Sequence, residues 1–176
     1  MLKKINIAKL IAGAMLTVGS SVAHANNFNY NFFEFRTAIS PQTFGGEYSA
    51  NFTENSHFVV RMDSRFESDY DTAVGVGFNG PMNQFGDIYG QVLLHHMNVR
   101  NDTGTESDTR AELNVGFRLW LTQQVELTGR VGKLDERSVF HAGVRFHSTQ
   151  QLSLSAETRN NGIYGPQITM SVRFQY

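Results

Sequence analysis

The sequence predicts an all-β protein, a closed antiparallel up-and-down β-barrel of ten strands, with eight strands as the alternative. Segments of about ten residues with alternating apolar and polar side chains recur along the chain, and turn residues separate them. No window has the period of an amphipathic helix of ordinary length. The last segment, 166–176, alternates without a break to the final residue. Because chain ends usually fray unless something holds them, a terminal strand this regular indicates a sheet that closes on itself.

The first 25 residues have the pattern of an export signal. Three lysines form a basic start, an apolar stretch runs from Leu10 to Val18, and Ala23-His24-Ala25 is a small-x-small cleavage pattern. The apolar stretch is too short for a membrane-spanning helix. We therefore expect a signal peptide at 1–25, cleavage after Ala25 and one domain at 26–176.

Composition narrows the class of protein further. The chain has no cysteine, so neither a disulfide nor a cysteine-linked lipid is expected. Removing the three lysines of the signal from 15 basic residues leaves 12 against 16 acidic ones. The sequence shows neither a basic patch nor an excess of basic residues, which excludes a nucleic-acid partner. Because no mature segment approaches 18 consecutive apolar residues, the chain could cross a membrane only as a barrel.

Ten strands are expected, and their alternation varies in quality. It is weak in the first, and Val92-Leu93-Leu94 interrupts it in the fifth. Connections after even-numbered strands are mostly tight, with Gly80 to Gly86 the longest; those after odd-numbered strands, including Asn101 to Asp108, are more acidic. The expected strands are 28–39, 44–52, 56–66, 70–79, 87–99, 109–121, 124–134, 138–148, 151–160 and 166–176.

The polar faces of these strands carry arginine and acidic residues, whereas the mature chain has a single lysine, Lys133. A solvated face usually mixes both cations, but a buried ion-pair network favours arginine, whose planar fork binds carboxylates and is weakly hydrated. We therefore place the polar face inside and the apolar face toward lipid, which makes the fold a transmembrane β-barrel. A soluble barrel with the opposite orientation is the alternative. The expected interior ion-pair network comprises Glu34, Arg36, Glu47, Arg61, Asp63, Arg65, Arg110, Glu112, Arg118, Glu126, Arg130, Arg145, Glu157, Arg159 and Arg173.

The chain resembles the small outer-membrane β-barrel proteins of Gram-negative bacteria, a group that includes the OmpA- and OmpX-like barrels. The resemblance rests on the signal peptide, the alternating strands, Gly75-Val76-Gly77-Phe78 leading through Pro81 to Asp87-Ile88-Tyr89-Gly90, and the aromatic C-terminus. It covers the whole mature chain and implies location in the outer membrane. It also implies that Val172, Phe174 and Tyr176 form the signal read by the outer-membrane assembly machinery. Members of this group include structural barrels, narrow pores, adhesins and a few lipid-modifying enzymes.

Two interpretations of the interior remain open, a packed lumen and a narrow water path. An eight-stranded barrel is just filled by side chains, and ten strands lie near that limit. Nine inward arginines against six inward acids would give a water path a weak anion preference. We expect an envelope-structural or surface-interaction role without catalysis; the alternative is a narrow, weakly anion-preferring channel for small solutes, and the second alternative a lipid-modifying enzyme.

No catalytic, cofactor-binding or metal site is expected. His141, Arg145 and His147 share one face of a strand, and hydrogen bonding inside the barrel is their default role. The lipid A deacylase barrels use a His-x-Ser pair on one face, whereas His147 and Ser148 are adjacent and face opposite sides. His95 and His96 also face opposite sides, so one strand cannot present both to a metal ion.

The expected partners are outer-membrane lipid, lipopolysaccharide and the assembly machinery. Acidic residues of the outer connections could also hold divalent cations together with lipopolysaccharide phosphates, because oxygen ligands suit hard cations. These residues are Glu67, Asp69, Asp71, Asp102, Glu106, Asp108, Asp135 and Glu136.

Overall fold

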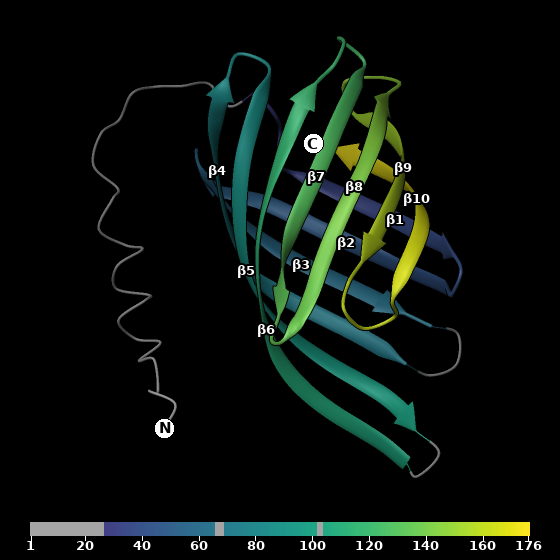
Figure 1. The fold of residues 1–176 in the computed structure, drawn as a ribbon. Helices are drawn as coiled ribbons and strands as arrows, with labels where there is room; N and C mark the ends of the chain where they lie inside the picture. The colour runs from purple at the N-terminus through teal and green to yellow at the C-terminus, as the bar shows by residue number, and fades with distance from the viewer. Residues whose placement is uncertain (1–26, 66–68, 102–103) are drawn as a thin grey trace.

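The computed structural model describes residues 27–65, 69–101 and 104–176, and these form ten strands closed into one barrel (Figure 1). Each strand pairs antiparallel with the next in sequence, and β1 closes the barrel against β10. The predicted ten strands are confirmed, and the eight-stranded alternative is wrong. The strands are β1 (Phe32–Ile39), β2 (Gln42–Thr53), β3 (Ser56–Ser64), β4 (Tyr70–Asn83), β5 (Gly86–Asn101), β6 (Gly104–Trp120), β7 (Val125–Leu134), β8 (Arg137–His147), β9 (Leu152–Asn160) and β10 (Pro166–Gln175).

In the described part of the chain, no helix is both long enough and apolar enough to span a membrane.

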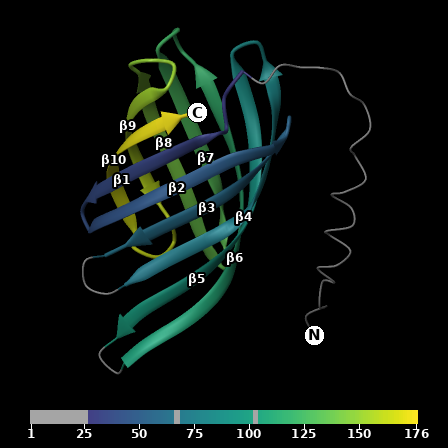
Figure 2. The ribbon, with the colours of Figure 1, turned by 180° about the vertical axis from the view of Figure 1, so that it is seen from behind.

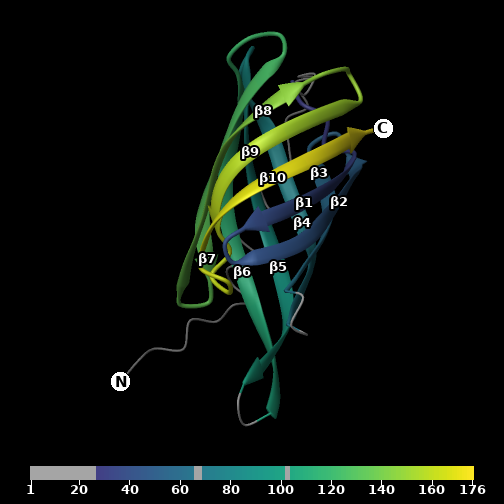
Figure 3. The same ribbon diagram turned by 90° about the vertical axis from the view of Figure 1, so that its right-hand side faces the viewer.

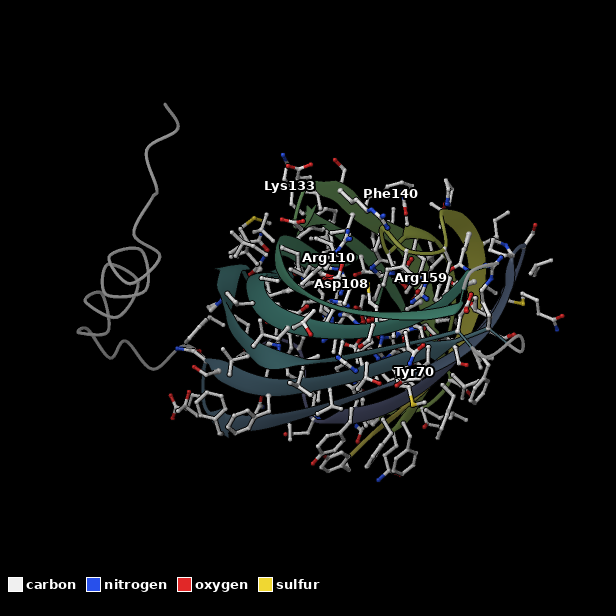
Figure 4. The ribbon with its side chains drawn as sticks, turned by 90° about the horizontal axis from the view of Figure 1, so that it is seen from below. Tyr70, Asp108, Arg110, Lys133, Phe140 and Arg159 are labelled. Carbon is white, nitrogen blue, oxygen red and sulfur yellow. The ribbon has the colours of Figure 1, made fainter. Side chains whose placement is uncertain are left out.

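Polar side chains point into the barrel and apolar side chains point out. On β1, Glu34 and Arg36 are buried, whereas Phe33 and Phe35 are about half exposed. Figure 4, which looks at the barrel from below, shows Phe140 on the outside of the ring of strands and Arg159 within it. The outward row is apolar on every strand, as lipid exposure requires. The predicted orientation of the two faces is confirmed.

The interruption at Val92-Leu93-Leu94 does not disturb the sheet. β5 keeps continuous register with β6 through these residues, so Leu93 points into the lumen. There it packs with Val59 and Ala73 in a small apolar cluster. Gly75 lies opposite and leaves the room, because a Cβ at that position would lie 2.8 Å from Leu93 Cδ2. One apolar side chain in the lumen therefore explains the broken alternation.

The first described residues and Tyr176 lie at the same end of the barrel, since the Tyr176 N–H donates to the Asn31 carbonyl oxygen and the Asn29 amide donates to the Tyr176 carbonyl oxygen, both at 3.2 Å. The turns after even-numbered strands and Tyr176 are found there, at the top of Figure 1. We call it the terminal end, and the opposite one the hairpin end. The seam is regular, since β1 and β10 pair from Phe32↔Gln175 to Ala38↔Thr169.

The first strand is shorter than predicted. β1 begins at Phe32, and residues 27–31 turn across the mouth of the barrel instead of extending the sheet. Phe28 and Tyr30 are only 5% and 3% exposed in this position. We call residues 27–31 the mouth segment. Its burial against the lumen replaces the ladder hydrogen bonds of a longer strand.

Two predicted loops are mostly strand. The expected loop from Asn101 to Asp108 is the tip of a hairpin, in which β5 and β6 pair as far as Asn101↔Gly104. β6 pairs with β7 only from Glu112 onward, so the hairpin projects beyond the other strands, as Figures 2 and 3 show. The expected loop from Gly80 to Gly86 shrinks to two residues, because the Asn83 side chain accepts a hydrogen bond from the Phe85 N–H at 2.8 Å.

Candidate functional site: the charged lumen

A connected set of ion pairs crosses the lumen. It starts at His95, which lies 2.9 Å from Asp71 and 3.0 Å from Glu112. Arg61 then links Glu112, at 3.8 Å, to Glu47, at 2.9 Å. These five side chains come from five successive strands, β2 to β6, so the contacts join half of the barrel wall.

Arg36 continues this set toward the seam of the barrel. Its guanidinium lies 3.3 Å from Glu47, 3.2 Å from Asp63 and 3.5 Å from Glu34. Arg159 on β9 joins through Asp63 at 2.9 Å, which ties β1, β2, β3 and β9 together. Arg36 is only 7% exposed, so these carboxylates must offset the cost of removing its charge from water.

Arg145 extends the set to the far wall. It lies 2.7 Å from Glu34 and 3.1 Å from Glu157, and it is 1% exposed. Arg173 adds a second contact to Glu34 at 2.7 Å, and His141 lies 2.9 Å from Glu157. The lumenal network consists of Glu34, Arg36, Glu47, Arg61, Asp63, Asp71, His95, Glu112, His141, Arg145, Glu157, Arg159 and Arg173.

A second charged cluster lies at the terminal end. Arg118 on β6 donates two hydrogen bonds to Glu126 on β7, at 2.6 and 3.0 Å, and His147 on β8 lies 2.8 Å from the same carboxylate. Such two-point binding holds both side chains in a fixed geometry.

Aromatic rings of the mouth segment stack on this second cluster. Phe28 lies between the Arg118 guanidinium, 4.5 Å from the ring centre, and Trp120, whose ring is 5.1 Å away and nearly parallel. The His147 ring also contacts Trp120, with ring centres 4.6 Å apart and the two planes tilted by 53°. Tyr30 stacks on His57 at 4.7 Å. The mouth segment therefore fills the terminal end with packed rings.

Hydrogen bonds fix the mouth segment in place. The Asn27 amide donates to the Asn83 carbonyl oxygen at 2.7 Å and to the Asp87 carboxylate at 3.1 Å. Trp120 Nε1 donates to the Asn27 carbonyl oxygen at 3.3 Å, and Arg118 donates to the Asn29 carbonyl oxygen at 3.1 Å. Contacts to β4, β5 and β6 thus hold the segment across the mouth.

A cavity of about 50 Å³ remains in the lumen. This volume has room for a few water-sized spheres, since one water needs roughly 10–15 Å³. Its charged lining comprises Glu34, Arg36, Glu47, Arg118, Glu126, Arg130, Arg145, Glu157, Arg159 and Arg173. The lumen between the two charged clusters is therefore largely filled by side chains.

The structure brings most of the predicted interior charges together, with two exceptions at the hairpin end. Arg65 lies 3.7 Å from Asp69, and Arg110 lies 2.7 Å from Asp108, both outside the lumenal network. Arg130 lines the cavity without joining the network. The other predicted charges belong to one of the two clusters.

Sequence reasoning missed two carboxylates of the lumen. Asp71 was expected in an outer connection but lies buried on β4 beside His95, and Asp87 is buried beside the mouth segment. Among the described residues the lumen then has seven arginines and eight carboxylates. The predicted excess of positive charge is therefore wrong for the lumen as a whole. The arginines are Arg36, Arg61, Arg118, Arg130, Arg145, Arg159 and Arg173, and the carboxylates are Glu34, Glu47, Asp63, Asp71, Asp87, Glu112, Glu126 and Glu157.

Among the described residues, three of the four inward histidines pair with carboxylates, and the fourth, His57, contacts the side-chain amide of Asn79 at 3.0 Å. His141 and His147 each contact a glutamate, and His95 lies between two acids. On the outward face, Ser107 Oγ lies 3.4 Å from His96 Nε2, but the other ring nitrogen faces the Thr109 hydroxyl. A nucleophilic site normally has an acidic group that orients its histidine. At His96 the Thr109 hydroxyl takes the position that such an acidic group would occupy.

The acidic outer connections are only partly described. Glu67 and Asp102 lie outside the described residues, as does the Glu106 side chain, and the described acids form no cluster that could hold a metal ion.

In the loop between β9 and β10, burial raises the pKa of the Tyr164 phenol, whose hydroxyl donates to the Asp63 carbonyl oxygen at 3.4 Å. The signal peptide and its cleavage site also lie outside the described part of the chain.

Comparison with known structures identifies the fold. The chain is similar to the KdgM porin, with a TM-score of 0.53, 8% identity, and 82% of this chain and 99% of that chain covered. The same values hold for the KdgM porin in complex with disordered oligogalacturonate. The N-terminal β-barrel domain of Pseudomonas aeruginosa OprF gives a TM-score of 0.46 at 13% identity, with 84% of this chain and 98% of that chain covered. No family model and no curated protein sequence matches. The chain has the fold of outer-membrane β-barrels, as the sequence resemblance implied.

Proposed function

We propose that this chain is an integral outer-membrane β-barrel protein with a packed, charged lumen and an envelope-structural or surface-interaction role without catalysis. The observation that carries the proposal is the lumenal network, which links nine of the ten strands across the interior. An interior crossed by buried ion pairs resists the passage of solutes, because each break would leave a buried charge unpaired.

The outward surface supports the proposed location. Apolar side chains cover it on every strand, and they suit outer-membrane lipid and the acyl chains of lipopolysaccharide. On β10 the outward residues Val172 and Phe174 are about half exposed, as is Tyr176 at the chain end. We propose that these three residues contact the assembly machinery, and that the signal peptide is cleaved after Ala25. Divalent cations at the outer acidic connections remain a prediction.

A narrow channel for small solutes is the second candidate, favoured by the fold shared with the KdgM porin. A water path would have to pass both the lumenal network and the mouth segment. The predicted weak anion preference of such a channel rested on an excess of inward arginines. The lumen as a whole has eight carboxylates and seven arginines among the described residues, so this excess is absent. The cavity wall alone retains more arginines than carboxylates.

Conductance in planar bilayers tests the proposal. The protein, extracted from membranes and shown to be folded by its heat-modifiable gel mobility, is added to the bilayer beside a known porin as positive control. We expect the protein to insert without steady single-channel steps. Reproducible ohmic steps would overturn the packed lumen and favour the channel, and reversal potentials would then give its ion preference.

Two further measurements address location and catalysis. A mature protein that stayed soluble without detergent would contradict the membrane location. Mass spectrometry of lipid A from expressing and non-expressing cells tests the lipid-modifying alternative, and we expect identical spectra.

A further inference from the structure

One lumenal arginine differs from the others. Among the described residues, Arg130 is the arginine of the lumen that has no carboxylate oxygen within 4.0 Å. Its hydrogen bond is a long one, 3.4 Å from Nη1 to the amide oxygen of Gln91. A guanidinium has five N–H donors. Arg130 therefore offers hydrogen-bond donors to the cavity that it lines, and its charge acts on Glu47 and Glu112 only from beyond ion-pair distance.

Other donors on the cavity wall also lack a partner. The Tyr30 hydroxyl and the Arg145 Nε belong to side chains that are almost fully buried. Neither group forms a hydrogen bond within the described chain. Arg173 lines the same cavity and uses its Nε for Glu34. A buried donor without an acceptor costs about 1–3 kcal/mol. These groups together favour an occupant that accepts hydrogen bonds.

The charge of the wall specifies the sign of that occupant. Six arginines and four glutamates line the cavity, an excess of two positive charges when the histidines are neutral. The carboxylates of the wall are already held by arginine or histidine partners in the ion pairs described above. A cation would find those oxygens occupied, whereas an anion would meet free guanidinium and hydroxyl donors.

The volume of the cavity limits the size of the occupant. About 50 Å³ is far below the roughly 300 Å³ of a pocket that takes an organic ligand. A monatomic anion with one or two waters fits this space, and a sugar or a nucleotide does not. Gly116 lies opposite Arg130 in the β6–β7 ladder, and the Tyr89 ring, which also lines the cavity, occupies the space that a side chain at Gly116 would need.

We propose that the cavity beside Arg130 is a binding site for a small inorganic anion of the halide class, with Arg130 as its principal ligand. The Tyr30 hydroxyl gives the mouth segment a contact with the same cavity. Bound anion thus stabilises the segment that closes the terminal end. The proposal is independent of whether the barrel conducts, because the cavity lies between the mouth segment and the lumenal network.

Bromide diffraction tests the site directly. Crystals of the wild-type protein soaked in sodium bromide should show an anomalous peak within hydrogen-bond distance of the Arg130 guanidinium. A cavity that contains water alone, with no anomalous peak there, would overturn the proposal. This measurement needs no variant and does not depend on how a substitution affects folding.

A thermal titration gives a second readout. The heat-modifiable gel transition of the detergent-solubilised protein is followed while chloride replaces gluconate at constant ionic strength, since gluconate is too large for the cavity. We expect the midpoint temperature to rise and saturate in the wild type and to stay flat in Arg130→Gln. Arg110→Gln, which removes the same charge at the hairpin end, is the matched control and should keep the wild-type response. An equal response in wild type and Arg130→Gln, or none in the wild type, would contradict the site.

Discussion

Truncation of Arg145 should destabilise the barrel more than truncation of any arginine at the hairpin end. Arg145 is 1% exposed and donates to Glu34 at 2.7 Å, to Glu157 at 3.1 Å and to Ser153 at 3.3 Å. Arg145→Met keeps much of the side-chain volume but removes the charge. Two carboxylates on different strands then lose a shared partner. Side chains fill most of the lumen, so bulk water has little room to replace it.

The magnitude follows from what the two carboxylates retain. Removing one partner of a buried ion pair costs about 3–5 kcal/mol, because the other charge remains buried and unpaired. Glu34 keeps Arg173 at 2.7 Å and Arg36 at 3.5 Å, and Glu157 keeps His141 at 2.9 Å. The remaining contacts offset part of the loss, so we expect the free energy of unfolding to fall by about 3 kcal/mol, at the low end of that range.

The assay is urea unfolding in lipid vesicles, followed by fluorescence. The chain has one tryptophan, Trp120, which packs against the rings of Phe28 and His147, so its emission reports loss of the folded terminal end. Arg110→Met is the matched control, because its pair with Asp108 is partly exposed and should contribute no more than about 1 kcal/mol.

A double variant separates the ion pair from the packing. Glu34→Gln combined with Arg145→Met removes one of the two carboxylates that the arginine leaves behind. The loss in the double variant should therefore be smaller than the sum of the two single losses. Unfolding of Arg145→Met at the same urea concentration as Arg110→Met, or simple addition of the two single losses, would show that Arg145 does not hold the two carboxylates in the way described.

Three further predictions concern the outer face, the chain end and the mouth segment. Val172→Arg on the outward face of β10 should lower the free energy of unfolding in vesicles by about 2–4 kcal/mol if it lies near the bilayer midplane; an unchanged value would count against lipid exposure. Tyr176→Ala should reduce the heat-modifiable fraction in cells more than refolding in detergent, and an equal reduction in both would argue against an assembly signal. Phe28→Ala should shift the tryptophan emission to longer wavelength and increase its quenching by acrylamide, whereas Phe44→Ala on the outer face should change neither.

The strands could be predicted because their pattern is local. Alternation over ten residues fixes both the strand and its two faces, and the preference for arginine over lysine identified the polar face as the interior. Asp71 could also have been found in this way, since it has the same parity as Ala73, which lies on the inward face of β4. Its place beside the acidic connection at Glu67 made it resemble a loop residue.

The mouth segment and the projecting hairpin could not be predicted from local pattern. Phe28 and Tyr30 alternate as a continued strand would, and only their contacts with Trp120 and His57, distant in sequence, make the fold-back favourable. The hairpin tip is polar and reads as a loop. Its strand conformation depends on the pairing of β5 with β6, in which each strand satisfies the backbone hydrogen-bonding groups of the other.

The scarcity of lysine follows from the geometry of the lumen. The largest apolar clusters inside the barrel contain only a few side chains, so ion pairs and not a hydrocarbon core join the walls. Arg36 contacts carboxylates on three strands, and a planar guanidinium can do so because its donors point in several directions. A lysine ammonium is a compact, strongly hydrated charge that costs more to bury and spans fewer partners. Lys133, the one lysine that follows residue 25, is accordingly exposed on β7 and lies at the periphery of the barrel in Figure 4. In a barrel whose outer face is apolar, the use of arginine in place of lysine on the polar face therefore indicates that this face is enclosed.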